Sequence, residues 1–255
     1  MKARIGGRDL AYEFFGGGKP LVLIHAFPLD GRMWTDTAQA LSNRCRLIVP
    51  DMRGFGESDL GGSDPSIADM ADDIAAMLDS LGIERAAVGG LSMGGYVSLA
   101  FAARHPARLE RLILADTRAA ADSDVARAGR ADALALVENE GVAALVERQL
   151  AVLLSSAASE TVREQVRGLG KQHPDGVSAG IRALRDRPDR RGELSAIACP
   201  TLVVVGTEDK ISPPAEMAGM ASAISGARLI EISGAGHLSN LEKPNDFTAA
   251  IANFI

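Results

Sequence analysis

The stretch that decides the fold is RAAVGGLSMGGYVSLAFAAR, residues Arg85–Arg104. Its first five residues form an apolar run typical of a strand, and its last ten have the composition of a helix. The pattern therefore predicts a strand, a sharp turn and a helix, with Ser92 at the apex of the turn. Such a turn strains its central residue and admits only small residues two positions away on either side, which Gly90 and Gly94 supply. The strain would lift the Ser92 hydroxyl clear of the sheet, beside the free N–H groups at the start of the helix.

Length and composition limit the class of protein. The chain has 255 residues, of which 47% are hydrophobic and 24% charged, which suits one large α/β domain or two small ones. A net charge of −6 without any basic run argues against nucleic acid as a partner. No apolar stretch reaches the roughly 20 residues that span a bilayer, and the first residues lack the apolar core of a signal peptide. We therefore expect a cytoplasmic protein that binds neither nucleic acid nor membrane, and we leave open whether it forms a homodimer.

The two cysteines point to the same compartment. Cys45 and Cys199 each lie beside a strand-like run. We expect both to be buried, reduced thiols and not a disulfide.

Strand-like and helix-like segments alternate through most of the chain. Ser66 and Asp69 have the spacing of a capping box and predict a helix that ends near Gly82. Alternation of this kind predicts an α/β fold: a mostly parallel, eight-stranded sheet with right-handed crossovers and helices on both faces. Besides the strand before Ser92, the expected strands are two short ones within residues 1–16 and the apolar runs at 21–24, 46–50, 109–115, 201–205 and 227–232.

The alternation stops between residues 118 and 193, where no strand-like run occurs. Apolar spacing predicts a helix carrying residues 142–154, a second carrying 162–169 and a third that starts at Pro174. We expect this segment to be an all-helical cap over the C-terminal edge of the sheet, where ligands bind in open α/β sheets. Residues 1–117 and 194–255 then form the core. Five cap arginines are expected to form a solvated face: Arg182, Arg185, Arg187, Arg190 and Arg191.

A serine nucleophile needs a base within hydrogen-bonding reach, and the chain offers four histidines. His237 follows the last strand in a glycine-rich loop, from which its side chain can reach over the sheet edge, so it is the candidate base. His25 is expected to bond loop backbone, His105 to end a helix and His173 to lie in a polar turn.

The base in turn needs a carboxylate that orients it. Asp209 closes the strand before the His237 loop and is the candidate acid. Asp116, also at a strand end, stays open as the alternative acid or as a residue that holds the cap hinge or a loop amide, and Glu208 would point the other way. The resulting chain order is Ser, Asp, His.

Two N–H groups are needed to stabilise the oxyanion of a tetrahedral intermediate. The amide of Met93, at the start of the helix after Ser92, is the first candidate. The second should come from the loop after the strand at 21–24, where Phe27 is favoured over Ala26.

The remaining charged motif, Asp51 and Arg53, is expected to have a structural role. Asp51 and Arg53 are expected to fix the glycine-rich loop that follows them, through Ser58. The sequence has no spacing of histidines or cysteines typical of a metal site and no dinucleotide fingerprint, so we expect neither a metal nor a cofactor.

Together these motifs resemble the α/β-hydrolase superfamily over almost the whole chain. Residues 25–28 are similar to its HGFP loop, with Ala26 in place of the usual glycine, and residues 51–58 are similar to its D-x-R-G-x-G-x-S loop. The segments 90–94, 206–209 and 234–237 match its nucleophile, acid and histidine segments. Ser92 is not an aspartate, so the chain does not resemble the haloalkane dehalogenases or epoxide hydrolases.

Within the superfamily, residues 90–95, 114–117 and 174–176 resemble the 3-oxoadipate enol-lactonase-like hydrolases and small bacterial carboxylesterases. This resemblance implies attack on an ester or lactone carbonyl, followed by hydrolysis of the acyl-enzyme by water, with no cofactor. An enol-lactone substrate would need a cation for its carboxylate. Arg118 is placed for that role, although a surface salt bridge is favoured for it.

We therefore predict a cofactor-free serine hydrolase that acts on a small ester or lactone. Two alternatives stay open. One is a perhydrolase, or cofactor-free haloperoxidase, in which peroxide replaces water, and the other is a ligand receptor with slow turnover. The expected substrate pocket is mainly apolar and is lined by Trp34, Leu145, Leu150, Leu153 and Leu238.

Overall fold

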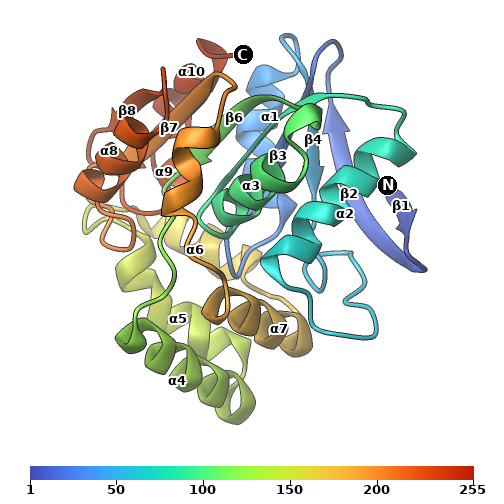
Figure 1. Cartoon of the computed structure of the whole chain (residues 1–255). Coiled ribbons are helices and arrows are strands. Elements are labelled where there is room, and N and C mark those ends of the chain that lie inside the picture. The colour runs from blue at the N-terminus through green and yellow to red at the C-terminus, as the bar shows by residue number, and fades with distance from the viewer.

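The computed structural model describes all 255 residues, and its strands form one eight-stranded sheet in the order β1-β2-β4-β3-β5-β6-β7-β8 (Figure 1). Strand β2 is antiparallel to both β1 and β4, and every other neighbouring pair is parallel. The predicted mostly parallel sheet is therefore confirmed. The strands are β1 (Lys2–Ile5), β2 (Arg8–Phe15), β3 (Pro20–Ile24), β4 (Arg46–Pro50), β5 (Ala86–Leu91), β6 (Leu109–Ala115), β7 (Thr201–Gly206) and β8 (Arg228–Ile232).

Core helices cover both faces of the sheet. Helices α2 and α3 pack on each other and α3 lies on β3, β5 and β6, while α1 packs against α10 (Figure 1). Helix α2 begins with the predicted capping box, in which Ser66 and Asp69 exchange hydrogen bonds. The core helices are α1 (Thr35–Leu41), α2 (Ile67–Ser80), α3 (Met93–Arg104), α8 (Pro214–Ala223), α9 (Ser239–Glu242) and α10 (Pro244–Ala252).

Four helices, not the three expected, lie between β6 and β7: α4 (Asp124–Glu140), α5 (Val142–Leu153), α6 (Glu160–Leu169) and α7 (Pro174–Arg185). Figure 1 shows α4, α5 and α7 gathered at one end of the molecule, away from the sheet. The sequence analysis missed α4 because its apolar stripe is thin, and only Ala133 and Val137 of this helix are buried. We call residues 118–193 the cap.

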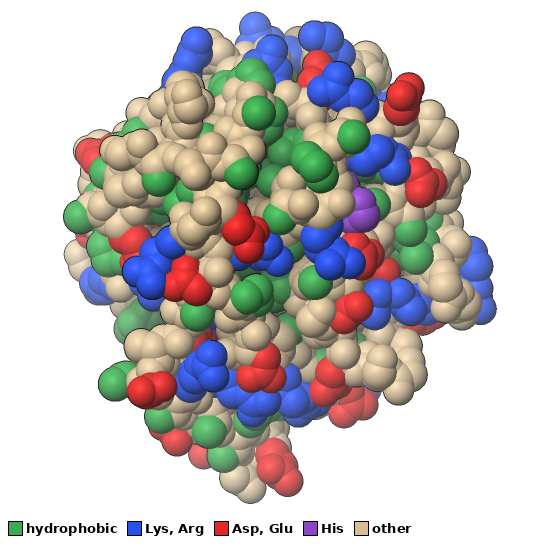
Figure 2. Space-filling model, viewed as in Figure 1, with side chains coloured by type: hydrophobic (Ala, Val, Ile, Leu, Met, Phe, Trp, Pro, Cys, Tyr) green, Lys and Arg blue, Asp and Glu red, His purple; other side chains and the backbone are tan.

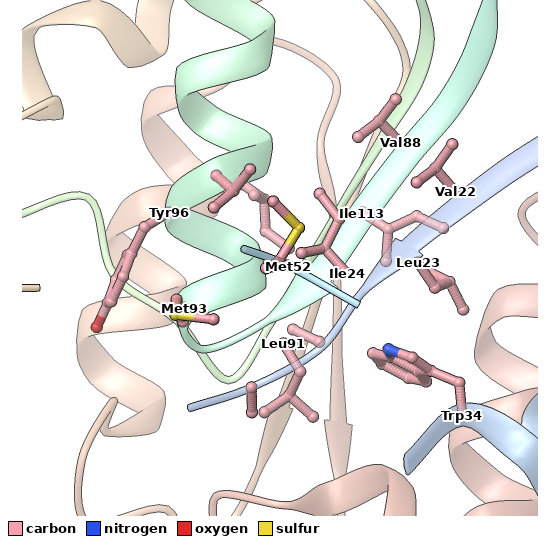
Figure 3. Close-up of a cluster of buried hydrophobic side chains, with 14 of the residues drawn as sticks. Val22, Leu23, Ile24, Trp34, Met52, Val88, Leu91, Met93, Tyr96 and Ile113 are labelled. Atoms are coloured by element: carbon pink, nitrogen blue, oxygen red, sulfur yellow. The ribbon is translucent and has the colours of Figure 1, made fainter. Parts of the chain in front are cut away.

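The cap and the sheet share one hydrophobic core. A single cluster of 77 buried residues contains strand residues such as Leu23 and Val88 together with cap residues such as Leu145 and Ile181. Figure 3 shows the part of this cluster beside α3, where side chains of β3, β5 and β6 such as Ile24, Val88 and Ile113 gather. Met93 lies at the start of the helix, and Tyr96 points away from these strands. No helix of the structure has the length and apolarity that crossing a bilayer requires.

The cysteines are both free, and burial raises the pKa of each thiol. Cys45 is buried, as expected, but Cys199 is only half-buried.

The cap arginines do not all form a solvated face. Arg182, Arg185 and Arg191 reach the surface and pair with carboxylates. Arg190 pairs with Glu193, but its side chain is only 13% exposed. Figure 2 likewise shows basic and acidic side chains interleaved over the visible face. The prediction was wrong for Arg187, which is 4% exposed, bonds Asp122 at 2.5 Å and lies 4.3 Å from the centre of the Tyr96 ring. Its partners lie far away in the sequence, so the local cluster of charge could not reveal this burial.

Candidate active site

The turn between β5 and α3 has the strained geometry that the sequence predicts. Ser92 has φ 55° and ψ −111°, in a region that non-glycine residues seldom adopt. A β-carbon at Gly90 would lie 2.5 Å from the backbone of Gly94, and one at Gly94 would lie 2.1 Å from the carbonyl oxygen of Ile24. Both glycines are therefore required by close backbone contact.

Backbone hydrogen bonds hold Ser92 in this conformation. Its amide donates to the Ala115 carbonyl at 3.0 Å. Its carbonyl accepts from the amides of Gly95 and Tyr96, at 2.9 and 3.1 Å, and from the hydroxyl of Thr117 at 2.8 Å. The strain is thus balanced by complete satisfaction of the Ser92 backbone.

His237 and Asp209 lie together next to the sheet edge. The Nδ1 atom of His237 is 2.8 Å from Oδ2 of Asp209, and the two residues are 1% and 4% exposed. The other oxygen of Asp209 accepts from the amides of Ile211 and Ser212 at 2.8 and 2.9 Å. This network assigns the proton to Nδ1, so Nε2 is free to accept one. No hydrogen bond joins Nε2 to the Ser92 hydroxyl here; in many enzymes that bond tightens only with substrate bound.

Asp116, the alternative acid, contacts other partners. Its Oδ1 accepts from the Gly206 amide at 2.8 Å, and its Oδ2 is hydrogen-bonded to the Ser239 hydroxyl. Complete burial, and then the charge of nearby Asp209, raise the pKa of Asp116 well above its usual value. The structure therefore pairs His237 with Asp209, and Asp116 holds the amide of Gly206, the last residue of β7.

The backbone amides of Met93 and Phe27, the two candidate oxyanion donors, lack other acceptors for different reasons. Met93 is the first residue of α3, so its amide has no preceding carbonyl of that helix to bond. The Phe27 amide donates to no other group of the protein, whereas the Ala26 amide donates to Sδ of Met33 at 3.1 Å. Hydrogen bonding thus favours Phe27 over Ala26. The contact of Gly94 with Ile24 brings the two segments together.

The remaining histidines bond locally. His25 is fully buried, lies 3.0 Å from the Ala26 carbonyl through Nδ1 and accepts the Met52 amide at Nε2, so it bonds loop backbone as expected. Burial lowers the pKa of His25 and keeps it neutral. His105 ends α3 and contacts Asp72. His173 caps the start of α7.

Asp51 fixes the loop at residues 51–58 from within, as expected. The carboxylate of Asp51 accepts from the amides of Gly31 and Glu57, and its carbonyl accepts from the Ser58 hydroxyl at 2.6 Å.

The expectation for Arg53 was wrong. Arg53 turns away from the loop and forms a buried ion pair with Asp73 of α2, which also binds Arg8. The sequence signal for this pair is weak, because an aspartate within an amphipathic helix normally faces water.

The sequence analysis also missed two contacts that join the cap to the core. The carboxylate of Glu242 accepts from the Ser155 hydroxyl at 2.5 Å and from the Gly236 amide at 2.9 Å. It therefore ties the end of α5 to the His237 loop.

On the opposite side of the cap, Gln172 donates to Asp30 at 2.7 Å and accepts the Gly56 amide at 2.8 Å. No local pattern marks these residues, because their partners are between 6 and 142 positions away.

The expected pocket residues are all buried. Trp34 packs against Phe247 with ring centres 5.7 Å apart, and Figure 3 places it in the same cluster as Leu23 and Leu91. The amide of Leu238 donates to the Leu153 carbonyl at 3.0 Å, which brings these two together beside His237. Leu145 and Leu150 lie on the buried face of α5.

Arg118 forms the favoured salt bridge. Its guanidinium lies 3.0 Å from the carboxylate of Glu216 and donates to the Ile211 carbonyl. The Arg118 guanidinium is therefore already bonded to groups of the protein.

Comparison with known proteins agrees with this geometry. Residues 19–244 match the family model of the alpha/beta hydrolase fold. The putative carbamate hydrolase RutD of Caulobacter sp. (strain K31) is 34% identical, over 96% of this chain and 95% of its own. The solved esterase from Thermogutta terrifontis is 40% identical with a TM-score of 0.95, over 99% and 96% of the two chains. The enol-lactonase from Burkholderia xenovorans LB400 is 31% identical with a TM-score of 0.92, over 100% of this chain and 99% of the enol-lactonase chain. The chain therefore belongs to the α/β-hydrolase family.

Proposed function

We propose that the protein is a cofactor-free serine hydrolase of small carboxylic esters or lactones, with Ser92 as nucleophile, His237 as base and Asp209 as acid. The observation that carries this proposal is the buried hydrogen bond between His237 Nδ1 and Asp209, in a chain whose strained strand-to-helix turn presents Ser92. The esterase and enol-lactonase likenesses support the same reaction class.

In the proposed reaction, His237 Nε2 takes the proton of the Ser92 hydroxyl as its oxygen attacks the substrate carbonyl. Asp209 keeps the proton on Nδ1 and stabilises the imidazolium that forms. The amides of Met93 and Phe27 donate to the oxyanion. His237 then protonates the leaving alkoxide, and a water that it activates hydrolyses the acyl-enzyme. Every catalytic group in this scheme comes from the chain, and only water and the substrate are added.

We propose an apolar pocket for the acyl or alcohol part of a small-molecule substrate. Leu153 and Leu238 meet next to His237, and Leu145 and Leu150 continue the apolar face of α5. Together with Trp34 they would form the lining. Because these side chains carry no charge, the proposal favours uncharged esters over a substrate recognised through a carboxylate.

Steady-state hydrolysis of p-nitrophenyl esters from C2 to C12 tests the proposal. Ser92→Ala should lower kcat/KM by at least about 10³-fold, since the nucleophile acts together with its base and acid. Ser222→Ala is the matched control, because Ser222 is exposed and bonds only the Ala218 carbonyl of its own helix. Turnover that is indifferent to Ser92→Ala would overturn the assignment.

Carbamate hydrolysis is a second candidate, favoured by the 34% identity to a putative carbamate hydrolase. Comparing kcat/KM for a p-nitrophenyl carbamate and for p-nitrophenyl acetate distinguishes a carbamate hydrolase from an esterase. Peracid formation from acetate and peroxide tests the perhydrolase alternative in the same preparation. A single turnover without steady-state release would instead indicate a receptor.

A further inference from the structure

Only two non-glycine residues of the chain have a positive φ angle. One is Ser92, with φ 55°, and the other is Asp116, with φ 44°. Residues held in this region cluster at functional sites, because the surrounding structure must compensate for their strain. Asp116 directly follows β6, the strand next to the one that carries Ser92. The proposed reaction assigns it no step.

The contacts of Asp116 join two of the three catalytic loops. Its Oδ1 accepts from the amide of Gly206, three residues before Asp209. Its Oδ2 is hydrogen-bonded to the hydroxyl of Ser239, two residues after His237.

The next residue, Thr117, reaches the third loop. Its hydroxyl donates to the Ser92 carbonyl at 2.8 Å. Its side chain also lies 2.5 Å from where a β-carbon of Gly95 would stand, so it packs directly on the first turn of α3. Two consecutive residues at the end of β6 thus contact the loops of the nucleophile, the acid and the base.

The surroundings of Asp116 favour its uncharged form. The side chain is fully buried, and the charged groups that face it are two acids, Asp209 from the loop after β7 and Glu242 from α9. No cation bonds its carboxyl group. Gly206 donates to Oδ1, and the Ser239 hydroxyl, which can rotate to donate or accept, bonds Oδ2 in either charge state of Asp116.

We propose that Asp116 is a positioning residue that acts as an uncharged carboxylic acid and fixes the Asp209 loop against the His237 loop, while Thr117 fixes the same strand end to Ser92. This inference rests on the proposed serine-hydrolase function, because positioning is defined by the groups it places. It differs from the alternative in which Asp116 is the charged acid that orients His237.

Activity of two substitutions at Asp116 distinguishes these roles. Asp116→Ala removes both hydrogen bonds and should lower kcat about 10- to 100-fold with KM within about threefold, since the catalytic groups lose their alignment but the pocket remains. Asp116→Asn matches the shape and hydrogen bonding of the uncharged acid and should recover kcat to within about threefold of the wild type. Asp209→Asn, as reference, should cost at least about 10³-fold.

Thermal stability provides a second readout that needs no substrate. The folded protein keeps a proton on Asp116 that the unfolded chain loses above about pH 4. The contribution of Asp116 to wild-type stability should therefore decline as pH rises from there, whereas the amide introduced by Asp116→Asn does not titrate. We expect the Tm of Asp116→Asn to exceed that of the wild type by at least about 2 °C at pH 8, and the difference to vanish towards pH 4.

Opposite signs would overturn the proposal. A Tm of Asp116→Asn that is lower than wild type at pH 8, with the gap closing at pH 4, would show an ionised, stabilising carboxylate. A loss of activity in Asp116→Asn as large as in Asp209→Asn would make Asp116 the catalytic acid. If no ester is hydrolysed by the wild type, the proposed function fails, while the stability comparison still decides the charge of Asp116.

Thr117 is tested with one variant of nearly equal size and one that keeps only the hydroxyl. Thr117→Val keeps the packing on Gly95 but removes the bond to the Ser92 carbonyl, and should lower kcat about three- to tenfold at unchanged KM. Thr117→Ser keeps the hydroxyl and should retain the wild-type kcat. Equal kcat values for the two variants would remove Thr117 from the proposal.

Discussion

At the scale of single residues, a hydrogen atom in place of a methyl group at Gly94 allows the Ser92 turn to form. A β-carbon there would lie 2.1 Å from the Ile24 carbonyl oxygen. The Ile24 backbone cannot retreat freely, because it is paired with Gly90 in the sheet.

We therefore expect Gly94→Ala to lower the free energy of unfolding by about 2–3 kcal/mol and to lower kcat as the turn distorts. Urea denaturation measures the stability. Gly129→Ala in α4 is the matched control, because nothing lies within 4 Å of its added carbon, and it should stabilise by about 0.5–1 kcal/mol. Equal stability of Gly94→Ala and the wild type would show that the contact is easily relieved.

Single residues also show what the sequence can predict. Asp209 and His237 are predictable because each follows a strand in a parallel sheet, so strand ends alone place them at one edge. Phe27 is favoured over Ala26 on position only, and the deciding bond from Ala26 to Met33 appears only in the folded chain. Glu242 gives no signal, because its partner Ser155 is 87 positions away.

At the scale of elements, Gln172 fastens the cap to two core loops. It donates to Asp30 and accepts the Gly56 amide. Burial opposes the charge of Asp30, but hydrogen bonds from Arg32 and Gln172 outweigh it and lower the pKa of this carboxyl group. The stabilisation is therefore present at neutral pH and is lost as pH falls through that lowered pKa.

We expect Gln172→Ala to cost about 1–2 kcal/mol at pH 7, because it removes the bond to charged Asp30 and the acceptor of the Gly56 amide. The cost should be smaller below pH 4, where Asp30 begins to be protonated. Hydrogen exchange at Gly56 should accelerate in this variant. Lys171→Ala, at the exposed neighbouring position, is the control and should leave that exchange unchanged. If the Gly56 amide exchanges at the wild-type rate in Gln172→Ala, the contact does not fasten the loop.

The accuracy of prediction differs between elements for a physical reason. The central strands β3 to β7 are mostly buried and recognisable as apolar runs, so they are expected close to their observed places. Helix α4 buries little, and the apolar spacing that predicts α5 to α7 is weak in it. The orientation of Arg53 towards Asp73 depends on how α2 packs on the sheet, which no local pattern encodes.

At the scale of the whole molecule, one buried cluster runs through both cap and core. A protein with two separate cores would unfold in two steps, whereas a shared core favours one cooperative transition. We expect a single transition in calorimetry, with far- and near-ultraviolet circular dichroism coinciding.

Leu145→Ala probes this cooperativity from the cap. Leu145 is fully buried, so its truncation should cost about 2–5 kcal/mol and shift the whole transition to lower temperature. Val152→Ala, on the same helix but 41% exposed, is the control and should shift it little. A second transition that appears only in Leu145→Ala would show that the cap unfolds independently of the core.

The position at which the cap begins matters for chimaeras in which one hydrolase receives the cap of another. The cap starts immediately after Asp116 and Thr117, the two residues that touch the loops of Ser92, Asp209 and His237. A chimaera that borrows the cap of a relative should therefore be joined after Thr117. A crossover only two residues earlier would exchange Asp116 and Thr117 together with the cap. The effects of the proposed positioning residues and of the proposed substrate pocket could then no longer be measured separately.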